Sequence, residues 1–259
     1  VVCMTVEAAL EAIRSMLGDM AFGEAGQEII IEDFMEGEEI SVFAVCDGKD
    51  FVLLPPSQDH KRAGEGDTGL NTGGMGAYAP VSIATSEVME EAATKVIAPT
   101  LEALAADGAP FRGLLYAGLM KTEDGLKVVE FNCRFGDPET QVVLPLMKSS
   151  LLDLLVAVAQ GRSVTNIVVE NHSGCAVATV LASGGYPGSY AKGKPIYLPT
   201  ELESDDLVLF HAGTAGTADA LVTSGGRVLA VTAVAKTFAE AAEASRAGAS
   251  QIGFEGAFY

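Results

Sequence analysis

The feature that most constrains this sequence is a predicted strand near its middle that ends on polar side chains. Residues 126–132 alternate, so every second side chain is expected on the same face of the strand. That face carries, in order, Leu126, Val128, Glu130 and Asn132. The pattern therefore places a carboxylate beside an amide oxygen, with Arg134 two residues further along the same face.

Two neighbouring oxygen groups at the end of an apolar strand need a positively charged partner, because burying an unpaired carboxylate costs several kcal/mol. Magnesium takes oxygen ligands and is often held by one or two protein groups, with phosphates and water completing its shell. The guanidinium of Arg134 suits a phosphate or a carboxylate. From these residues alone two interpretations stay open: a metal site at Glu130 and Asn132, or a structural Glu130–Arg134 ion pair.

The rest of the pattern predicts an α+β fold with largely antiparallel strands. Residues 113–120 form a strand that turns at 123–125 into the strand described above. Further strands are expected at 27–34, 39–46, 51–54, 175–181, 207–211 and 227–235. Helices are expected after the caps Thr5, Ser149 or Ser150, and Thr237, and over 86–106 with a bend or break at Pro99.

Residues 55–80 lack a hydrophobic period, and we expect a long functional loop there. The segment is rich in glycine, which lets backbone N–H groups approach an anion closely. Together with Lys61, Arg62, Asn71 and Thr72, these glycines are candidates for binding phosphates or an anionic substrate. A mobile surface loop is the alternative.

An acidic stretch, Glu32-Asp33-Phe34-Met35 followed by Glu39, is a candidate nucleotide site. Where a strand passes between two subdomains, its free backbone groups match the donor and acceptor edge of adenine. A carboxylate such as Glu39 can accept hydrogen bonds from both ribose hydroxyls. A solvated acidic hairpin is the competing interpretation.

Composition excludes several classes of partner. The formal net charge of −19 argues against binding a nucleic-acid backbone. The four cysteines are scattered without a C-x-x-C pair, which is typical of reduced thiols in a cytoplasmic protein. We expect no membrane-spanning segment, because no apolar run is long enough.

Three segments together are highly specific: SQDHKR at 57–62, NTGGMGAY at 71–78 and EFNCRFGDPE at 130–139. They closely resemble the phosphoribosylamine–glycine ligases, or glycinamide ribonucleotide synthetases, of the ATP-grasp superfamily. The resemblance extends over essentially the whole chain, including 21–26, 184–188, 210–214 and 225–232. It implies an ATP-grasp fold of mostly antiparallel sheets with packed helices, plus a small C-terminal mixed β/α domain.

The resemblance implies a step of de novo purine synthesis. ATP phosphorylates the carboxylate of glycine, and the amine of 5-phosphoribosylamine attacks the acyl phosphate to give glycinamide ribonucleotide, ADP and phosphate. A metal and an arginine would stabilise the charge on the transferring phosphoryl group.

Carried onto this chain, the resemblance makes Glu130 and Asn132 the ligands of Mg²⁺ or Mn²⁺. It implies that Glu32, Asp33 and Met35 hold adenine and that Glu39 holds the ribose. The candidates for catalysis are Asp59, Lys61 and Arg134. The candidates for substrate binding are Asn71, Thr72, Gly73, Gly74 and Asp137.

Two departures from the family pattern stand out. Many ATP-grasp enzymes carry a third metal carboxylate on the preceding strand, at a position that corresponds here to Ala117. The chain also starts after the family's N-terminal substrate domain and stops short of its usual end. We expect residues 1–40 to be a remnant of the small ATP-grasp subdomain, 41–162 the catalytic core and 163–259 an incomplete C-terminal domain.

We therefore expect this chain to be a fragment with little or no ligase activity by itself, taken from a cytoplasmic protein. The resemblance implies that such a ligase can be part of a longer multifunctional purine-synthesis polypeptide. Its partners would be the small molecules ATP, glycine and 5-phosphoribosylamine. Two alternatives remain: another ATP-grasp carboxylate–amine ligase, or a nucleotide-binding or assembly module without catalysis.

Overall fold

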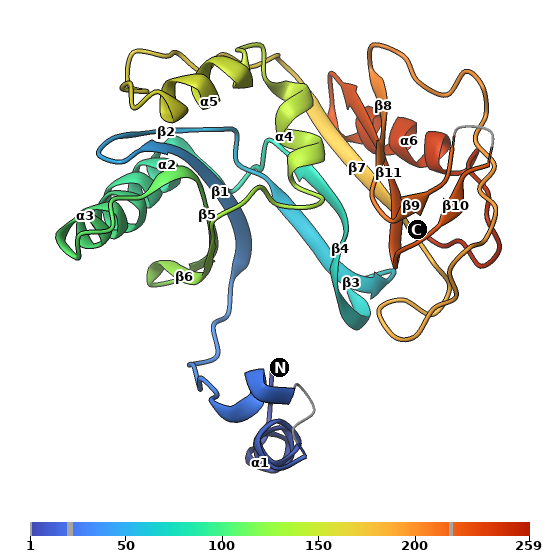
Figure 1. The fold of residues 1–259 in the computed structure, drawn as a ribbon, viewed down its shortest axis with the longest axis horizontal. Coiled ribbons are helices and arrows are strands. Elements are labelled where there is room, and N and C mark those ends of the chain that lie inside the picture. Colours follow the sequence, from blue (N-terminus) through green and yellow to red (C-terminus); the bar gives the residue numbers. More distant parts are fainter. Residues whose placement is uncertain (1, 20–22, 218–219) are drawn as a thin grey trace. The chain divides into compact units, whose positions relative to one another are not determined.

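The computed structural model describes residues 2–19, 23–217 and 220–259 (Figure 1). The chain divides into two compact units, residues 1–37 and 38–259, and each is described by itself. The family-like stretch 21–26 lies partly outside the described residues, since 20–22 are not among them.

The first unit begins with the predicted helix, α1 (Val6–Ile13). The hydroxyl of Thr5 accepts a hydrogen bond from the N–H of Ala8 at 3.2 Å, which confirms the predicted cap. The helix continues as a π-helix, η1 (Arg14–Gly18), and a 3₁₀ helix, η2 (Gly23–Gln27), follows.

The strand predicted at 27–34 is wrong. Residues 28–36 form neither helix nor strand, and Ile30 and Ile31 are 87% and 78% exposed. A strand needs a neighbour to pair its backbone groups, and the described part of the first unit contains no strand. The β-branched run alone is therefore not enough to form one.

The second unit contains a four-stranded antiparallel sheet with the order β2-β1-β5-β6. Its strands are β1 (Glu38–Asp47), β2 (Phe51–Leu53), β5 (Arg112–Thr122) and β6 (Gly125–Asn132). Both predicted hairpins are confirmed, since β1 pairs with β2 and β5 with β6.

Helices cover one face of this sheet (Figure 1). They are α2 (Ser86–Glu91), the π-helix η3 (Ala92–Ile97) and α3 (Ala98–Ala106). The predicted interruption near Pro99 is present as the π-helical turn just before it, because proline cannot donate an N–H to the helix. Ile40, Val42, Leu115 and Ala117 pack against these helices.

The opposite face of the sheet is apolar at one end and polar at the other. Phe43, Val45 and Leu114 pack there against α5 (Leu151–Ala159), which Ser150 caps as predicted. The strand residues Glu39 and Ser41 continue the same face towards the start of β1, because side chains alternate along a strand. This polar end is where the candidate site is built.

Residues 55–80 form a hairpin, so the predicted long loop is wrong. The strands β3 (Gln58–Gly64) and β4 (Thr68–Ala79) pair antiparallel around a tight turn in which Gly66 and Asp67 have φ of 68° and 58°. The hydrophobic period is missing because glycines and polar residues occupy most of both strands, not because the backbone is irregular.

The hairpin belongs to a second antiparallel sheet with the order β3-β4-β7-β11-β8. Its other strands are β7 (Cys175–Ala182), β8 (Leu207–His211) and β11 (Arg227–Ala235), all three at their predicted places. Two short strands, β9 (Thr214–Ala215) and β10 (Val222–Thr223), form a separate ribbon. The predicted capping box of Thr237 and Glu240 starts α6 (Phe238–Ala249), which packs on β7 and β11.

The helix α4 (Thr140–Leu146) lies between the first sheet and the second sheet (Figure 1). Its Val142 and Leu146 pack against Ala77 of β4 and Ala176 of β7. The second sheet thus combines strands from both sides of residue 163, and the division into 1–40, 41–162 and 163–259 stays a prediction.

The structure corrects the prediction that Leu126, Val128, Glu130 and Asn132 all share one face of the strand. The pairing of β6 with β5 shifts between Glu130, opposite Gly118, and Val128, opposite Leu119, so that Val129 forms a bulge. The bulge turns Leu126 to the helix-covered side, where it packs, and leaves Glu130 and Asn132 on the other side.

The position expected for a third metal carboxylate is also wrong. Ala117 pairs with Phe131 and is completely buried against the helices, so it lies on the face away from Glu130. The strand neighbour of Glu130 is Gly118, where an added Cβ would lie 3.4 Å from the Glu130 Cγ.

We predict that Ala117→Asp destabilises the chain strongly, by at least about 3 kcal/mol, because it buries a charge without a partner. Val128→Asp, at a position 39% exposed on the neighbouring strand, is the matched control and should cost less than about 1 kcal/mol. Urea denaturation measures both. Equal losses for the two variants would contradict the complete burial of Ala117.

Candidate functional site

The polar end of the first sheet brings residues from three strands into register. Ser41 of β1, Gly118 of β5 and Glu130 of β6 lie opposite one another, and the next row holds Phe43, Tyr116 and Asn132. Residues in one row point to the same side of an antiparallel sheet. Glu130 and Asn132 are therefore presented on the face that also carries Ser41 and Glu39.

Glu130 and Asn132 are in contact, as the sequence predicted. The Asn132 side-chain amide donates a hydrogen bond to Glu130 Oε1 at 2.9 Å. The two groups offer hard oxygen atoms side by side on an exposed strand end, a donor set that fits magnesium with phosphates and water completing the shell. No cluster of three or more His, Cys, Asp or Glu side chains suited to a metal occurs within the described ranges.

Arg134 does not continue that face. The strand β6 ends at Asn132, and the Arg134 guanidinium donates to the carbonyl of Phe135 at 2.9 Å. Among the residues that the structure describes, no ion pair joins Arg134 to Glu130, which removes the structural Glu–Arg pair as an explanation of the motif.

The start of β3 lies beside β1 and brings two predicted catalytic residues to the same face. A two-way backbone bridge between Ser41 and Ser57 fixes this approach, with N···O distances of 2.8 and 3.0 Å. The Lys61 ammonium then pairs with the carboxylate of Glu39 and lies 3.7 Å from Asp59 Oδ1. Glu39, Asp59 and Lys61 therefore form one charged cluster.

A third carboxylate, from Glu139, is buried next to this cluster, and the sequence analysis did not single it out. Its Oε1 accepts from the Tyr116 hydroxyl at 2.7 Å and from Ser41 Oγ at 3.3 Å. Glu139 is only 3% exposed. Gly136 makes room for it, because a Cβ there would lie 2.6 Å from Glu139 Oε2. A glutamate directly after the cis Asp137–Pro138 bond at the end of a recognised motif was the available signal.

These charges shift one another's protonation. The pKa of Asp59 is raised from 3.8 to about 6, mainly by burial; Lys61 opposes this rise, and the charges of Glu139 and Glu39 contribute to it. Burial lowers the pKa of Lys61, but the hydrogen bond to Glu39 and the charge of Asp59 outweigh this, so its pKa stands above the ordinary value. Burial and Glu139 raise the pKa of Tyr116. The cluster therefore keeps Lys61 protonated and brings the pKa of Asp59 close to neutral pH.

The predicted substrate residues 71–74 lie on β4, and most of their polar groups are occupied within the protein. Thr72 Oγ1 donates to the carbonyl of Lys61 at 2.8 Å and accepts from the N–H of Gly74 at 3.0 Å. The N–H of Gly73 is donated to the hydroxyl of Tyr186 at 2.9 Å. Asn71 faces Arg62 across the hairpin and is exposed.

Asp137 lies next to this segment. Its Oδ1 accepts from the Gln141 side chain at 2.9 Å, and its Oδ2 lies 3.5 Å from the guanidinium of Arg227, which starts β11. The same guanidinium also contacts the carbonyls of Gly73 and Gly74. Neither Tyr186 nor Arg227 was predicted from the sequence, since both lie more than 100 residues along the chain from Gly73.

The predicted adenine residues belong to the first compact unit. Glu32 and Asp33 are exposed there, and Met35 is half-buried. Their role, like that of every other site residue named from the sequence, stays a prediction.

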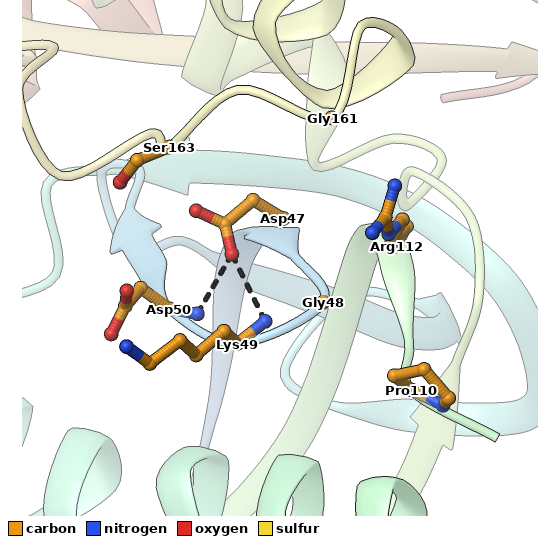
Figure 2. A pocket seen from close by; sticks show the side chains of 8 residues that line it. All are labelled: Asp47, Gly48, Lys49, Asp50, Pro110, Arg112, Gly161 and Ser163. Atoms are coloured by element: carbon orange, nitrogen blue, oxygen red, sulfur yellow. Dashed lines mark hydrogen bonds between the residues drawn. The ribbon is translucent and has the colours of Figure 1, made fainter. Parts of the chain in front are cut away.

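A cavity of about 480 Å³ lies elsewhere, at the far end of the first sheet (Figure 2). Its lining residues are Asp47, Gly48, Lys49, Asp50, Pro110, Arg112, Gly161 and Ser163. Figure 2 shows the Asp47 carboxylate accepting from the N–H groups of Lys49 and Asp50, which closes the turn between β1 and β2. Asp47 lies roughly 27 Å along β1 from Glu39, at about 3.4 Å per residue. None of the predicted site residues lines this cavity.

We predict that Asp59 makes the fold less stable as pH rises from about 4 to about 6. In this window the unfolded chain has released the proton of Asp59, whereas the folded chain still binds it, so stability falls by up to about 3 kcal/mol. Urea denaturation across this pH range measures the effect. Asp59→Asn should show a smaller decline than the wild type over the same range, and an identical decline would contradict the burial of an ionisable Asp59.

Comparison with known proteins gives the family. The profile described as "Phosphoribosylglycinamide synthetase, ATP-grasp (A) domain" matches residues 1–140, and the corresponding C domain matches residues 176–259. A phosphoribosylamine–glycine ligase from Chlorobaculum tepidum is 49% identical over 259 residues, which cover all of this chain and 61% of the relative. The human trifunctional purine biosynthetic protein adenosine-3 is 45% identical, with 100% of this chain and 26% of that protein covered.

A solved structure agrees. The crystal structure of phosphoribosylamine–glycine ligase from Thermotoga maritima superposes with a TM-score of 0.82 at 35% identity, covering 96% of this chain and 62% of that one. The chain thus spans less than two thirds of the length of these relatives. With the A-domain profile alone matching more than half of its residues, and with the expected antiparallel sheets in place, the chain belongs to the phosphoribosylglycinamide synthetase family and has an ATP-grasp fold followed by a C-terminal domain.

Proposed function

We propose that this chain supplies the ATP-grasp core of a ligase that joins glycine to 5-phosphoribosylamine. The products are glycinamide ribonucleotide, ADP and phosphate, and the intermediate is glycyl phosphate. The observation that carries the proposal is the contact of Glu130 with Asn132 on the sheet face that also holds the Lys61 cluster, in a chain of this family. Acidic oxygens and a charged lysine on one face suit the transfer of a phosphoryl group.

ATP-grasp proteins use ATP together with a divalent metal, and we assign Mg²⁺ or Mn²⁺ to Glu130 and Asn132. The fit rests on the carboxylate of Glu130 beside the side-chain amide of Asn132 at the exposed end of β6. When bound, the metal neutralises charge on the phosphates. The missing side chain of Gly118 leaves the space beside Glu130 open for those phosphates.

The nucleotide itself is assigned to the residues that the sequence predicts for it. Glu32, Asp33 and Met35 hold the adenine through their backbone groups, and Glu39 accepts from the ribose hydroxyls. In the structure Glu39 is paired with Lys61. Binding of the ribose therefore competes for Glu39 and releases the Lys61 ammonium towards the phosphates.

Arg134 and Lys61 are assigned to the transferring phosphoryl group. Arg134 uses one N–H on the carbonyl of Phe135, and the remaining donors of its fork are available to an oxygen of the acyl phosphate. Lys61 is kept protonated by its acidic neighbours.

Asp59 is assigned to the proton of the attacking amine. As the C–N bond forms, the C–O bond to phosphate breaks, phosphate leaves with the electron pair, and the nitrogen must lose a proton. A pKa of about 6 leaves Asp59 mostly ionised at neutral pH. Because this pKa is close to the working pH, the carboxylate can accept that proton efficiently. Asn71, Thr72, Gly73, Gly74 and Asp137 hold the two amine substrates.

The remaining features of the parent protein are part of the same proposal. We assign it to the cytoplasm, and to a longer polypeptide because relatives named as trifunctional or bifunctional purine biosynthetic proteins match this chain. In the part of the chain that the structure describes, no helix combines the length and hydropathy needed to cross a membrane. By itself the chain is expected to have little or no ligase activity.

The test is ADP release that depends on both glycine and 5-phosphoribosylamine, in the presence of magnesium. We predict that a chain extended at both ends to the length of its relatives is active, and that Glu130→Ala with Asn132→Ala lowers its kcat by about 100-fold or more, since metal-assisted charge stabilisation is lost. The chain of 259 residues alone should be nearly silent.

Glu123→Ala is the matched control, because Glu123 is an exposed glutamate at the turn of the same β5–β6 hairpin. It should leave kcat within about 2-fold of the wild type. If the extended wild type is folded and binds ATP but releases no ADP, the ligase proposal fails and a binding or assembly module replaces it. Activity with a different amine in place of phosphoribosylamine would identify another ATP-grasp ligase.

A further inference from the structure

Arg227 connects three separate parts of the second unit through one guanidinium. Its Nη1 donates to the carbonyls of Gly73 and Asp137, both at 2.5 Å, and lies 3.4 Å from the carbonyl of Gly74. Its Nη2 lies 3.5 Å from Asp137 Oδ2. The partners are 154 and 90 residues away along the chain, so these contacts exist only in the folded molecule.

The backbone at Gly73 and Gly74 is shaped to receive this side chain. A Cβ on Gly73 would lie 3.0 Å from Arg227 Cζ, so the guanidinium lies directly against the glycine backbone. Gly74 has φ of +113°, and a Cβ there would lie 2.4 Å from Pro138 Cδ. Only glycine meets both demands, since a side chain would be strained and would collide with the proline ring.

Tyr186 binds the other backbone polar group of Gly73. Its hydroxyl accepts from the N–H of Gly73 at 2.9 Å, while Arg227 takes the Gly73 carbonyl. The N–H of Gly74 is already donated to Thr72. Both peptide groups of this segment are therefore bound inside the protein, which favours a positioning role for the two glycines over an open cradle for anions.

Asp137 is the polar side chain that this arrangement leaves facing outwards. It is 47% exposed, whereas Arg227 is 21% exposed. Gln141 holds one carboxylate oxygen and Arg227 lies by the other, so the carboxylate has a defined direction and a reduced net charge.

We propose that Arg227 is a positioning residue, through which the start of β11 fixes residues 73–74 and Asp137 in the geometry that the amine substrates require. The inference rests on the proposed function for its substrate class, and on the contacts above for the positioning. Arg227 does not touch the reacting atoms. It acts through Asp137, which supplies the charge complementary to a substrate ammonium or amine.

The positioning is tested on the present chain by amide hydrogen exchange. Arg227→Met should speed exchange in peptides covering 71–76 and 133–139 by about 10-fold or more, since hydrogen bonds from a charged donor are lost. Arg246→Met, at an exposed arginine in the last turn of α6, is the matched control and should leave both peptides unchanged. Unchanged exchange in Arg227→Met, with an intact circular dichroism spectrum, overturns the inference whether or not the ligase assay succeeds.

The substrate effect is tested in the extended, active enzyme. Arg227→Met should raise the KM of glycine or phosphoribosylamine on the order of 10-fold to 100-fold, because a misplaced contact of this kind costs that much, while the KM of ATP changes less than about 2-fold. Arg227→Lys should recover part of the loss, since one ammonium can reach the two carbonyls at 2.5 Å but not form the planar fork.

A uniform loss overturns the positioning role. If Arg227→Met raises the KM of ATP as much as that of the amine substrates, or if Arg227→Lys behaves like Arg227→Met while both remain folded, Arg227 only stabilises the fold. A silent extended wild type refutes the ligase proposal instead, and the hydrogen-exchange result then stands on its own.

Discussion

The buried carboxylate of Glu139 connects the start of α4 to strands β1 and β5 of the first sheet. It accepts hydrogen bonds from Tyr116 on β5 and Ser41 on β1, and it stands directly before α4, which packs on β4 and β7. A hydrogen bond to a charged group is worth about 1.5–3 kcal/mol, so this residue fixes α4 against the first sheet more firmly than apolar contact alone would.

The cost of that arrangement is an excess of negative charge. Glu39, Asp59 and Glu139 share one face with a single lysine, and two of these three carboxylates are almost completely buried. Burial, together with the repulsion from Glu139 and Glu39, raises the pKa of Asp59, and the attraction of the carboxylates keeps Lys61 charged. The cluster thus lowers the stability of the fold, but it provides Asp59 with a raised pKa and Lys61 in its charged form. Functional sites commonly combine reduced stability with such groups.

The sequence predicted the elements that carry a local apolar or capping pattern, and it missed those that depend on glycines or on long-range contacts. The alternating apolar strands β1, β5 and β11 and the capped helices α1, α5 and α6 were placed correctly, because burial and capping leave local signals. The β3–β4 hairpin was missed because its glycines carry no hydrophobic pattern, and the bulge at Val129 reversed the faces of the residues before it. The contact of Glu130 with Asn132 could be predicted, since it is local, whereas Glu139 with Tyr116 and Arg227 with Gly73 depend on tertiary pairing that no local pattern encodes.

The pairing of β4 with β7 has a consequence for the order in which the molecule is built. During synthesis, β4 ends at Ala79 and its partner begins at Cys175, so the ribosome must add nearly a hundred residues before that strand edge is covered. Arg227 emerges later still. The segment at Gly73 and Gly74 is therefore incompletely held until β7 and β11 have joined the sheet, and this part of the site is completed only after residue 227 has been synthesised.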